Sequence, residues 1–282
     1  LSVIIVSFKS DEVIHDCINS IDSDIEIIVV DNSNDMKFKE NIEKKYKNIK
    51  CFLSGSNIGM GAGNNLGINK SNKDYALILN PDVRLEFDAL NEIIEASKKL
   101  DDFGLIAPIS SNSKYPNYKS NTFNNAEPFE VNSVDGYAML LNLKKLKKIK
   151  NFNFFDENFF LYLENDDLCK NLKKNNESIY IIPRSKIKHL GGKAVDSKYE
   201  IEIEYSRNWH WMWSKFYFNK KHYGFLIGIL KILKNLTSAI LKYFLYLILL
   251  NSYKRKIYQM RLSGLYNSII GKKSFYRPKI NN

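Results

Sequence analysis

Residues 3–31 of the chain read VIIVSFKSDEVIHDCINSIDSDIEIIVVD, and this stretch decides the fold class. Residues 3–8 and 25–31 are continuous apolar runs rich in β-branched side chains, as expected of strands buried on both faces. Between these runs, apolar residues at positions 13, 14, 17, 18 and 21 recur at helical spacing. The order strand, helix, strand predicts a βαβ unit with two parallel strands.

The same alternation continues through the first hundred residues. Residues 50–54 and 75–80 predict two further strands, and residues 37–47 and 86–100 predict helices. The predicted fold class is therefore α/β, with a mostly parallel sheet flanked by helices. Ligands of such sheets bind at the carboxyl ends of the strands. The residues at these ends are Ser7, Phe8, Asp31, Asn32, Asn80, Pro81 and Asp82.

A glycine-rich stretch, NIGMGAGNNLG, occupies residues 57–67. A dinucleotide-binding fingerprint needs G-x-G-x-x-G directly after the first strand, and neither the spacing nor the position fits here. The G-x-x-x-x-G-K-[ST] phosphate loop is absent too. Two interpretations remain open. The stretch is either a flexible turn before a helix that packs closely on a strand, or a place where Asn57, Gly59 and Asn64 approach a ligand.

Positive charge is concentrated at the end of the chain. The 282 residues carry a net charge of +11, and from Tyr205 to Asn282 there are 15 Lys or Arg and no Asp or Glu. The first 204 residues hold the remaining 27 basic residues and all 31 acidic ones, so this part is nearly neutral. Such asymmetry predicts a polyanionic partner for the tail, either nucleic acid or an anionic membrane.

The tail contains a long apolar segment at residues 222–250 that is interrupted by lysines. Lys231, Lys234 and Lys242 share one helical face with Ser238, whereas a spanning helix needs about 20 mostly apolar residues without charge. This pattern predicts an amphipathic helix in the membrane interface, with NWHWMW at 208–213 supplying three interfacial Trp. Nucleic acid is disfavoured, because no binding module accompanies the charge. The alternative is a helical subdomain that packs on the domain formed by the first 204 residues or on a second subunit of a homo-oligomer.

Residues 159–169, FFLYLENDDLC, place three carboxylates and one amide on four successive positions. Acidic residues favour the first turn of any helix, because they face its positive dipole end. A cluster of carboxylates can also supply a general base. Composition alone leaves both interpretations open.

Seven motifs taken together resemble inverting family 2 glycosyltransferases of the GT-A fold, most closely their bacterial rhamnosyltransferase-like branch. The resemblance covers roughly residues 1–195 and rests on the order of the motifs more than on any one of them. The motifs are VIIVSF (3–8), VVDNSND (29–35), NIGMGAGNNLG (57–67), LILNPDV (77–83), VDGYAML (134–140), FDENFFLYLENDDLC (155–169) and the histidine of IKHLGG (187–192).

The resemblance implies a donor site at the carboxyl ends of the strands. Asp82 would hold Mn²⁺ or Mg²⁺, with Asn80 near the sugar or phosphate and His189 completing the metal or diphosphate site. Asp31 would recognise the nucleobase beside Ser7 and Phe8. The residues alone allow blander roles: an Asx-turn for Asp82 and capping of a turn through Ser33 for Asp31.

The resemblance places the acceptor near Asp135 and Gly136 and the catalytic base in the acidic cluster. The branch usually reads Glu-Asp-x-Asp-Leu-Cys, with the base in second position. Here Glu164 and Asp167 match, but Asn165 occupies the base position, and an amide cannot accept a proton at neutral pH. Either Asp166, Asp167 or Glu164 serves as base, or the protein is catalytically silent.

These expectations combine into one predicted function and domain organisation. The protein would move rhamnose or a hexose from a dTDP- or UDP-sugar to a lipid-linked or polysaccharide acceptor, with inversion. Residues 1–100 would form the nucleotide-sugar half and 101–204 the acceptor half, followed by a basic helical extension at 205–282. Three scattered cysteines fit a reducing compartment, so we expect the inner face of the plasma membrane.

Two rival functions follow from the same residues. A silent GT-A-like protein that binds nucleotide sugar or a partner is favoured by Asn165 alone. A sugar nucleotidyltransferase would need a basic glycine-rich loop directly after the first strand, and residues 9–11, KSD, do not supply one.

Overall fold

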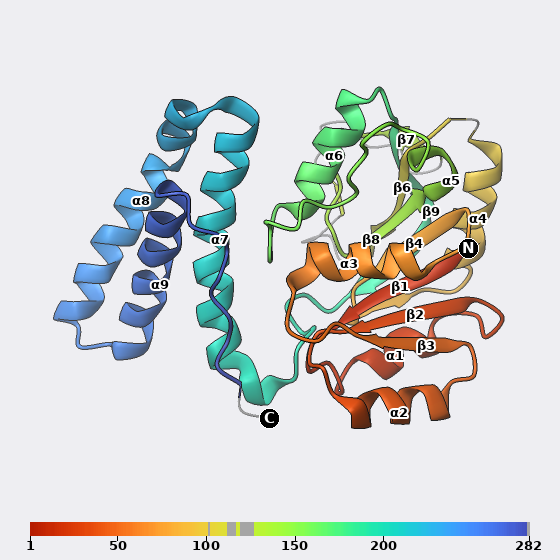
Figure 1. Ribbon diagram of the computed structural model, residues 1–282, viewed down its shortest axis with the longest axis horizontal. Helices are drawn as coiled ribbons and strands as arrows, with labels where there is room; N and C mark the ends of the chain where they lie inside the picture. The colour runs from red at the N-terminus through yellow and green to blue at the C-terminus, as the bar shows by residue number, and fades with distance from the viewer. Residues whose placement is uncertain (101, 112–116, 119–126, 281–282) are drawn as a thin grey trace. The chain divides into compact units, whose positions relative to one another are not determined.

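The computed structural model describes residues 1–100, 102–111, 117–118 and 127–280, which form two compact units (Figure 1). The first unit comprises Leu1–Asp156 and Asn165–Asp196, and the second comprises Glu157–Glu164 and Ser197–Asn282.

The first unit alternates strands and helices, as the apolar pattern predicts. Its elements are β1 (Ser2–Ser7), α1 (Ile14–Asn19), β2 (Glu26–Asp31), α2 (Met36–Lys45), β3 (Ile49–Leu53), α3 (Gly59–Lys70), β4 (Tyr75–Leu79), β5 (Val83–Leu85), α4 (Ala89–Lys99), β6 (Leu105–Ser110), β7 (Phe129–Glu130), β8 (Ala138–Asn142), α5 (Leu143–Leu146), α6 (Glu164–Lys174) and β9 (Ile179–His189).

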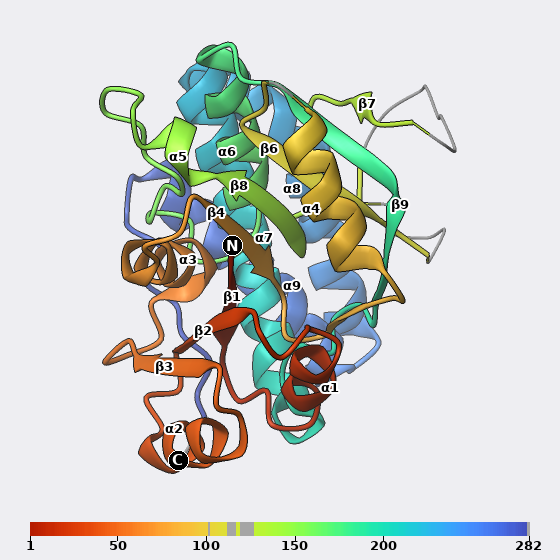
Figure 2. The same ribbon diagram turned by 90° about the vertical axis from the view of Figure 1, so that its right-hand side faces the viewer.

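The strands form one mixed sheet in the order β3-β2-β1-β4-β8-β6-β9-β5, with β7 paired to β9 (Figure 2). Neighbours from β3 to β4 are parallel, and β6 is parallel to β9. Strand β8 runs antiparallel between β4 and β6, and β5 and β7 run antiparallel to β9. The prediction of an α/β fold with a mostly parallel sheet is confirmed.

Alternating side chains of the central strand enter two separate cores. Val3 and Ile5 pack with residues of α1, α2 and α4 on one face. Ile4 and Val6 pack with residues of α3 and α6 on the other. Because both faces are covered, every residue of β1 is buried, which explains why residues 3–6 are continuously apolar rather than alternating.

The glycine-rich stretch is helical from Gly59 onward, so the helix begins earlier than the flexible-turn interpretation expects, while the close packing of this helix on a strand is confirmed. A Cβ atom added at Gly67 would lie 2.3 Å from Ile4 Cγ2, and one added at Gly63 would lie 2.8 Å from Val6 Cγ1. The glycines therefore let the α3 backbone lie directly on β1.

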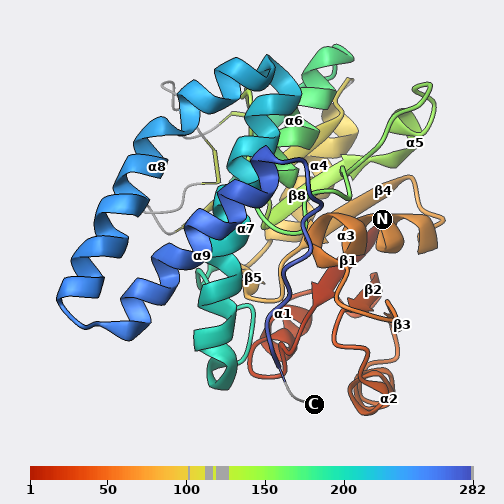
Figure 3. The ribbon, with the colours of Figure 1, turned by 60° about the vertical axis from the view of Figure 1, so that its left-hand side comes forward.

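The second unit is built on three long helices, α7 (Glu200–Tyr223), α8 (Phe225–Ile248) and α9 (Ser252–Ile269), preceded by the 3₁₀ turn η1 (Ser197–Tyr199). Figure 3 shows the three helices side by side. Met212 and Phe216 of α7, Ile232 of α8 and Leu265 of α9 form their shared core. No helix in the described part of the chain is long and apolar enough to cross a membrane.

Two of the three tryptophans of the second unit do not face outward as expected for interfacial residues, whereas Trp211 is partly buried. Trp209 and Trp213 are buried, and their indole N–H groups donate to Ser263 Oγ at 3.2 Å and to the Lys272 carbonyl at 3.0 Å. The prediction was wrong for these two residues because a tryptophan side chain, with an apolar ring and one N–H donor, suits a membrane interface and a helix–helix interface equally well.

We predict that Gly67→Ala lowers the free energy of unfolding by about 1–2 kcal/mol. Overpacking against Ile4 costs about 1–3 kcal/mol, and the better helix propensity of alanine offsets up to about 1 kcal/mol. Urea unfolding measures the difference. The matched control is Asn69→Ala on the exposed side of α3, which should stay within about 0.5 kcal/mol of the parent; an unchanged Gly67→Ala would contradict the close approach.

Candidate functional site

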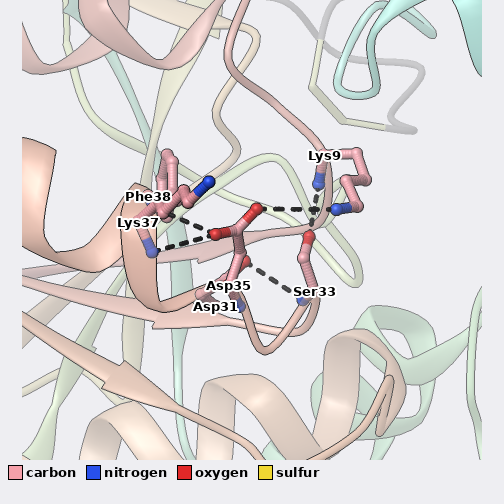
Figure 4. Close-up of polar contacts among 6 residues, drawn as sticks. All are labelled: Lys9, Asp31, Ser33, Asp35, Lys37 and Phe38. Carbon is pink, nitrogen blue, oxygen red and sulfur yellow. Dashed lines mark hydrogen bonds and ion pairs between the residues drawn. The ribbon is translucent and has the colours of Figure 1, made fainter. Parts of the chain in front are cut away.

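The turns that follow β1 and β2 are tied together at the carboxyl edge of the sheet (Figure 4). Asp31 accepts hydrogen bonds from the backbone N–H groups of Ser33 at 3.1 Å and Asp35 at 2.8 Å. Ser33 Oγ accepts from the N–H of Lys9 at 2.8 Å, and Lys9 Nζ lies 3.7 Å from Asp35 Oδ2. Asp31 therefore makes the turn-capping contacts, while its recognition of a nucleobase stays a prediction.

Asp31 is a buried carboxyl group with opposed influences on its ionisation. Burial raises its pKa, and the hydrogen bonds from Asp35 and Ser33 oppose that rise by favouring the charged form. The Asp31 carboxyl group therefore accepts two backbone hydrogen bonds in a buried environment that disfavours its charged form.

Helix α3 approaches the same edge through its first turn. Asn32 donates from Nδ2 to the carbonyl of Gly59 at 3.0 Å, and the backbone N–H of Asn32 donates to the backbone carbonyl of Ser7 at 2.8 Å. Asn57 Oδ1 accepts from the N–H of Gly59 at 3.3 Å. Asn64 is buried on the same helix, and Phe8, directly after β1, is half-buried.

Asp82 and His189 meet at the end of β4. The antiparallel register of β5 and β9 pairs Val83 with His189, and this pairing brings His189 Nε2 to 3.4 Å from Asp82 Oδ2. The same carboxylate oxygen accepts from the N–H of Lys193 at 3.2 Å. The His189 ring stacks on Tyr137, with centroids 4.1 Å apart. Two residues that the sequence separates by more than a hundred positions thus share one site.

Several buried oxygen atoms at this edge accept no hydrogen bond from the described part of the chain. An unsatisfied buried polar atom costs about 1–3 kcal/mol, so a cluster of them indicates a surface shaped for a polar ligand. These atoms are Ser7 Oγ, Asn32 Oδ1, Asn64 Oδ1, Asn80 Oδ1 and Asp82 Oδ1.

The residues at Asp82 fit a sparsely coordinated divalent cation. Among the described residues no group of three His, Cys, Asp or Glu could hold a metal. Asp82 and His189 form a two-residue set, and Asp82 Oδ1 is a buried carboxylate oxygen without a described partner. Mg²⁺ is typically held by one or two carboxylates together with substrate phosphates, so two protein ligands suffice for a cation that arrives with a diphosphate.

The first turn of α6 lies on the loop before β8. Asn165 Nδ2 donates to the Val134 carbonyl at 2.7 Å, and Ser133 Oγ donates to Asp166 Oδ1 at 2.9 Å. A Cβ atom added at Gly136 would lie 3.1 Å from Asn165 Cβ, so only glycine fits there without displacement. The structure therefore brings the acidic cluster beside the predicted acceptor residues Asp135 and Gly136.

The three carboxylates of the cluster differ in accessibility. Glu164 and Asp167 are buried, whereas Asp166 is only partly buried and is oriented by Ser133. The cluster also begins helix α6 at Glu164, so the helix-start and reactive-centre interpretations are compatible. The two residues before the helix, Tyr162 and Leu163, have φ of 69° and 67°, a sparsely populated conformation for residues with side chains.

Sequence reasoning missed several residues of this edge. Lys9 directly follows a predicted strand, so the rule that identified Ser7 and Asp31 would have found it. Tyr137 and Ser133 carry no local signal, because only the pairing of distant strands and helices brings them to His189 and Asp166.

We predict that Asn165→Asp destabilises the protein by about 1–3 kcal/mol at pH 8, because two acceptors would face each other at Val134. Only a protonated carboxyl can donate to that carbonyl, so its folded-state pKa should rise above the unfolded value of about 3.9. The loss is therefore small near pH 4 and grows as pH rises. Denaturant unfolding of variant and parent at both pH values measures it.

Asn41→Asp, an exposed change on α2, is the matched control and should show no such pH dependence. Equal stability of Asn165→Asp and the parent at pH 8 would show that the Asn165–Val134 hydrogen bond contributes nothing.

The fold resembles solved glycosyltransferase structures. The structure of S. aureus TarS residues 1–349 superposes with a TM-score of 0.53 at 14% identity, covering 98% of this chain and 92% of that one. GalNAc-T7, solved with UDP, GalNAc and Mn²⁺, superposes with a TM-score of 0.53 at 13% identity over 67% of this chain. The match spans only 43% of the GalNAc-T7 chain.

Sequence comparison points to the same class of protein. The low-salt glycan biosynthesis hexosyltransferase Agl10 of Haloferax volcanii is 26% identical over an alignment of 231 positions, and the alignment covers 73% of this chain and 73% of that protein. Residues 2–172 match the family described as glycosyl transferase family 2. This match covers more than half of the chain, and with the GT-A-like fold it shows that the chain belongs to glycosyl transferase family 2.

Proposed function

We propose that the protein transfers a hexose or rhamnose from a nucleotide diphosphate to a hydroxyl group of a growing glycan. The observation that carries this proposal is the meeting of Asp82, His189 and buried unsatisfied oxygens at one edge of the sheet. The hexosyltransferase relative in glycan biosynthesis and the UDP-bound structure of TarS residues 1–349 support it.

At the donor end, Asp82 and His189 hold the diphosphate side of the donor. A divalent cation bound at Asp82 would neutralise negative charge on the departing diphosphate. Asn80 and Asn64 offer amide groups to the sugar or the phosphates, and the turns around Asp31 and Lys9 face the nucleoside. The nucleotide is either UDP or dTDP, and the rhamnosyltransferase-like character remains part of the proposal.

At the acceptor end, Asp166 is the carboxylate best placed to take the acceptor proton. Ser133 fixes Asp166 Oδ1, and the side chain is more accessible than Asp167 or Glu164. The acceptor oxygen forms a bond to the anomeric carbon as the bond to the diphosphate oxygen breaks. The proton passes to Asp166, the nucleoside diphosphate leaves, and a single displacement inverts the anomeric configuration.

The silent-protein alternative is weakened by the contacts of Asn165. Its amide donates to the Val134 carbonyl, so the asparagine has a structural role that an ionised aspartate could not fill. Although position 165 carries no carboxylate, Asp166 beside it is still available as the base.

We further place the enzyme at the inner face of the plasma membrane, acting on a lipid-linked or polysaccharide acceptor. Residues 205–282 contain 15 basic residues and no acidic residue, and this positive charge favours binding of the enzyme to an anionic membrane surface.

We predict that UDP- or dTDP-sugars raise the melting temperature only weakly without Mn²⁺ and strongly with it, and that Asp82→Asn abolishes the Mn²⁺-dependent part. Removing one of two protein ligands should weaken metal-dependent binding at least roughly tenfold. A thermal-shift titration measures both effects. The control is Asp24→Asn in the exposed Asp22-Ser23-Asp24 loop, a literal Asp-x-Asp motif before β2, which should behave as the parent.

We also predict that Asp166→Asn lowers kcat by roughly 100-fold or more while donor binding is unchanged, because a general base contributes about 10²–10⁴. Initial rates of sugar transfer measure this. Asp167→Asn is the matched comparison one residue on. If Asp166→Asn keeps full activity and Asp167→Asn loses it, the catalytic base is Asp167 and not Asp166. If the parent protein binds donors but turns over none of those tested, the silent-protein alternative is favoured.

A further inference from the structure

Helix α8 presents a largely apolar face outward from the second unit, interrupted by Thr237. Leu226, Leu230, Leu241 and Ile248 are 76%, 66%, 70% and 78% exposed. Their spacings of 4, 11 and 7 residues place them on one side of the helix. Phe244 adds a further exposed ring on that side. Soluble proteins rarely expose so many large apolar side chains together, so this face indicates a binding surface.

The opposite side of α8 is fixed in place by the other two helices. Ile232 packs into the core with Met212, Phe216 and Leu265. A Cβ atom added at Gly228 would lie 3.2 Å from the backbone nitrogen of Lys220, so α8 lies close against α7. Rotating the helix to hide its outward face would break these contacts, and the apolar face is therefore a permanent feature of the unit.

Lysines line one flank of this face. Lys231, Lys234 and Lys242 are exposed, and the ammonium groups of Lys231 and Lys242 lie over the rings of Tyr223 and Tyr258 at 4.1 and 5.6 Å from the centroids. No acidic residue occurs from Tyr205 to Asn282 to neutralise them. The surface is thus apolar in its middle and cationic at its edge.

We propose that α8 lies flat in the interface of an anionic lipid bilayer, with Leu226, Leu230, Leu241, Phe244 and Ile248 in the acyl boundary and the three lysines at the headgroups. A helix of 24 residues covers about 36 Å of the surface. This inference deepens the proposed function by naming the part of the enzyme that contacts the membrane.

A second copy of the chain fits this face less well than lipid. Two α8 faces packed together would bring lysines near lysines, and residues 205–282 contain no carboxylate to separate them. Anionic headgroups supply the missing negative charge, and each lysine near such a surface contributes about 1 kcal/mol, or about fivefold in affinity.

The test is flotation of the full chain with vesicles of phosphatidylcholine, alone or with phosphatidylglycerol. We expect binding to the mixed vesicles only. Leu226→Gln, Leu230→Gln and Leu241→Gln combined should lower binding at least roughly tenfold, because each loses buried apolar area. Lys231→Gln, Lys234→Gln and Lys242→Gln combined should lower it by roughly 100-fold.

Matched controls use residues of the first unit. Phe87→Gln changes a fully exposed ring, and Lys44→Gln, Lys47→Gln and Lys148→Gln remove three exposed charges; both should bind as the parent. Equal vesicle binding by the α8 variants and these controls would overturn the proposal. So would a parent dimer, detected by light scattering, that becomes monomeric in the leucine variant.

Vesicle binding needs no donor or acceptor, so its failure is separate from failure of the proposed activity. If the α8 variants bind soluble donor with Mn²⁺ as the parent does but do not float, the membrane role stands independently of the chemistry. Circular dichroism and the melting temperature of each variant confirm that the exposed substitutions leave the fold intact.

Discussion

The parallel register of the central strands fixes the positions of the residues at the carboxyl edge of the sheet. Strand β1 pairs with β2 so that Ser7 lies opposite Asp31, and it pairs with β4 so that Ile4 lies opposite Ile78. These pairings bring the residues that follow three strands to one edge of the sheet. A shift of one residue would turn the buried side chains of β1 to the opposite face, and both cores resist such a shift because both faces are packed.

Two further arrangements use that edge. Absence of side chains at Gly63 and Gly67 lets α3 lie on β1, which brings the start of the helix to Asn32. The antiparallel pairing of β5 with β9 brings the end of β9 close to Asp82, so that His189 contacts Asp82. Neither arrangement supplies chemistry by itself. Each positions polar groups at the edge of the sheet that β1, β2, β3 and β4 form.

The parts that sequence predicts well are those with local signals. Continuous apolar runs identify β1, β2 and β4, and the rule about carboxyl ends identifies Asp31 and Asp82 from the same runs. Long-range pairing escapes this reasoning. The stacking of Tyr137 on His189 depends on strands that are far apart in sequence, and the burial of Trp209 depends on the approach of α9. The family resemblance anticipated His189 through its motif, without any physical account of how it would reach Asp82.

Asn165 illustrates how an amide can hold a loop in place where an ionised carboxylate could not. The first turn of α6 holds the loop before β8, and in the proposed mechanism it also supplies the base. A neutral amide can donate to the Val134 carbonyl, whereas an ionised carboxylate cannot. Asp166, the next residue, accepts a hydrogen bond from the Ser133 hydroxyl instead and is partly exposed. The turn thus places the amide that holds the loop directly beside a partly exposed carboxylate. The departure of Asn165 from the usual motif of the family is therefore compatible with the proposed mechanism, because neighbouring residues supply the positioning contact and the carboxylate.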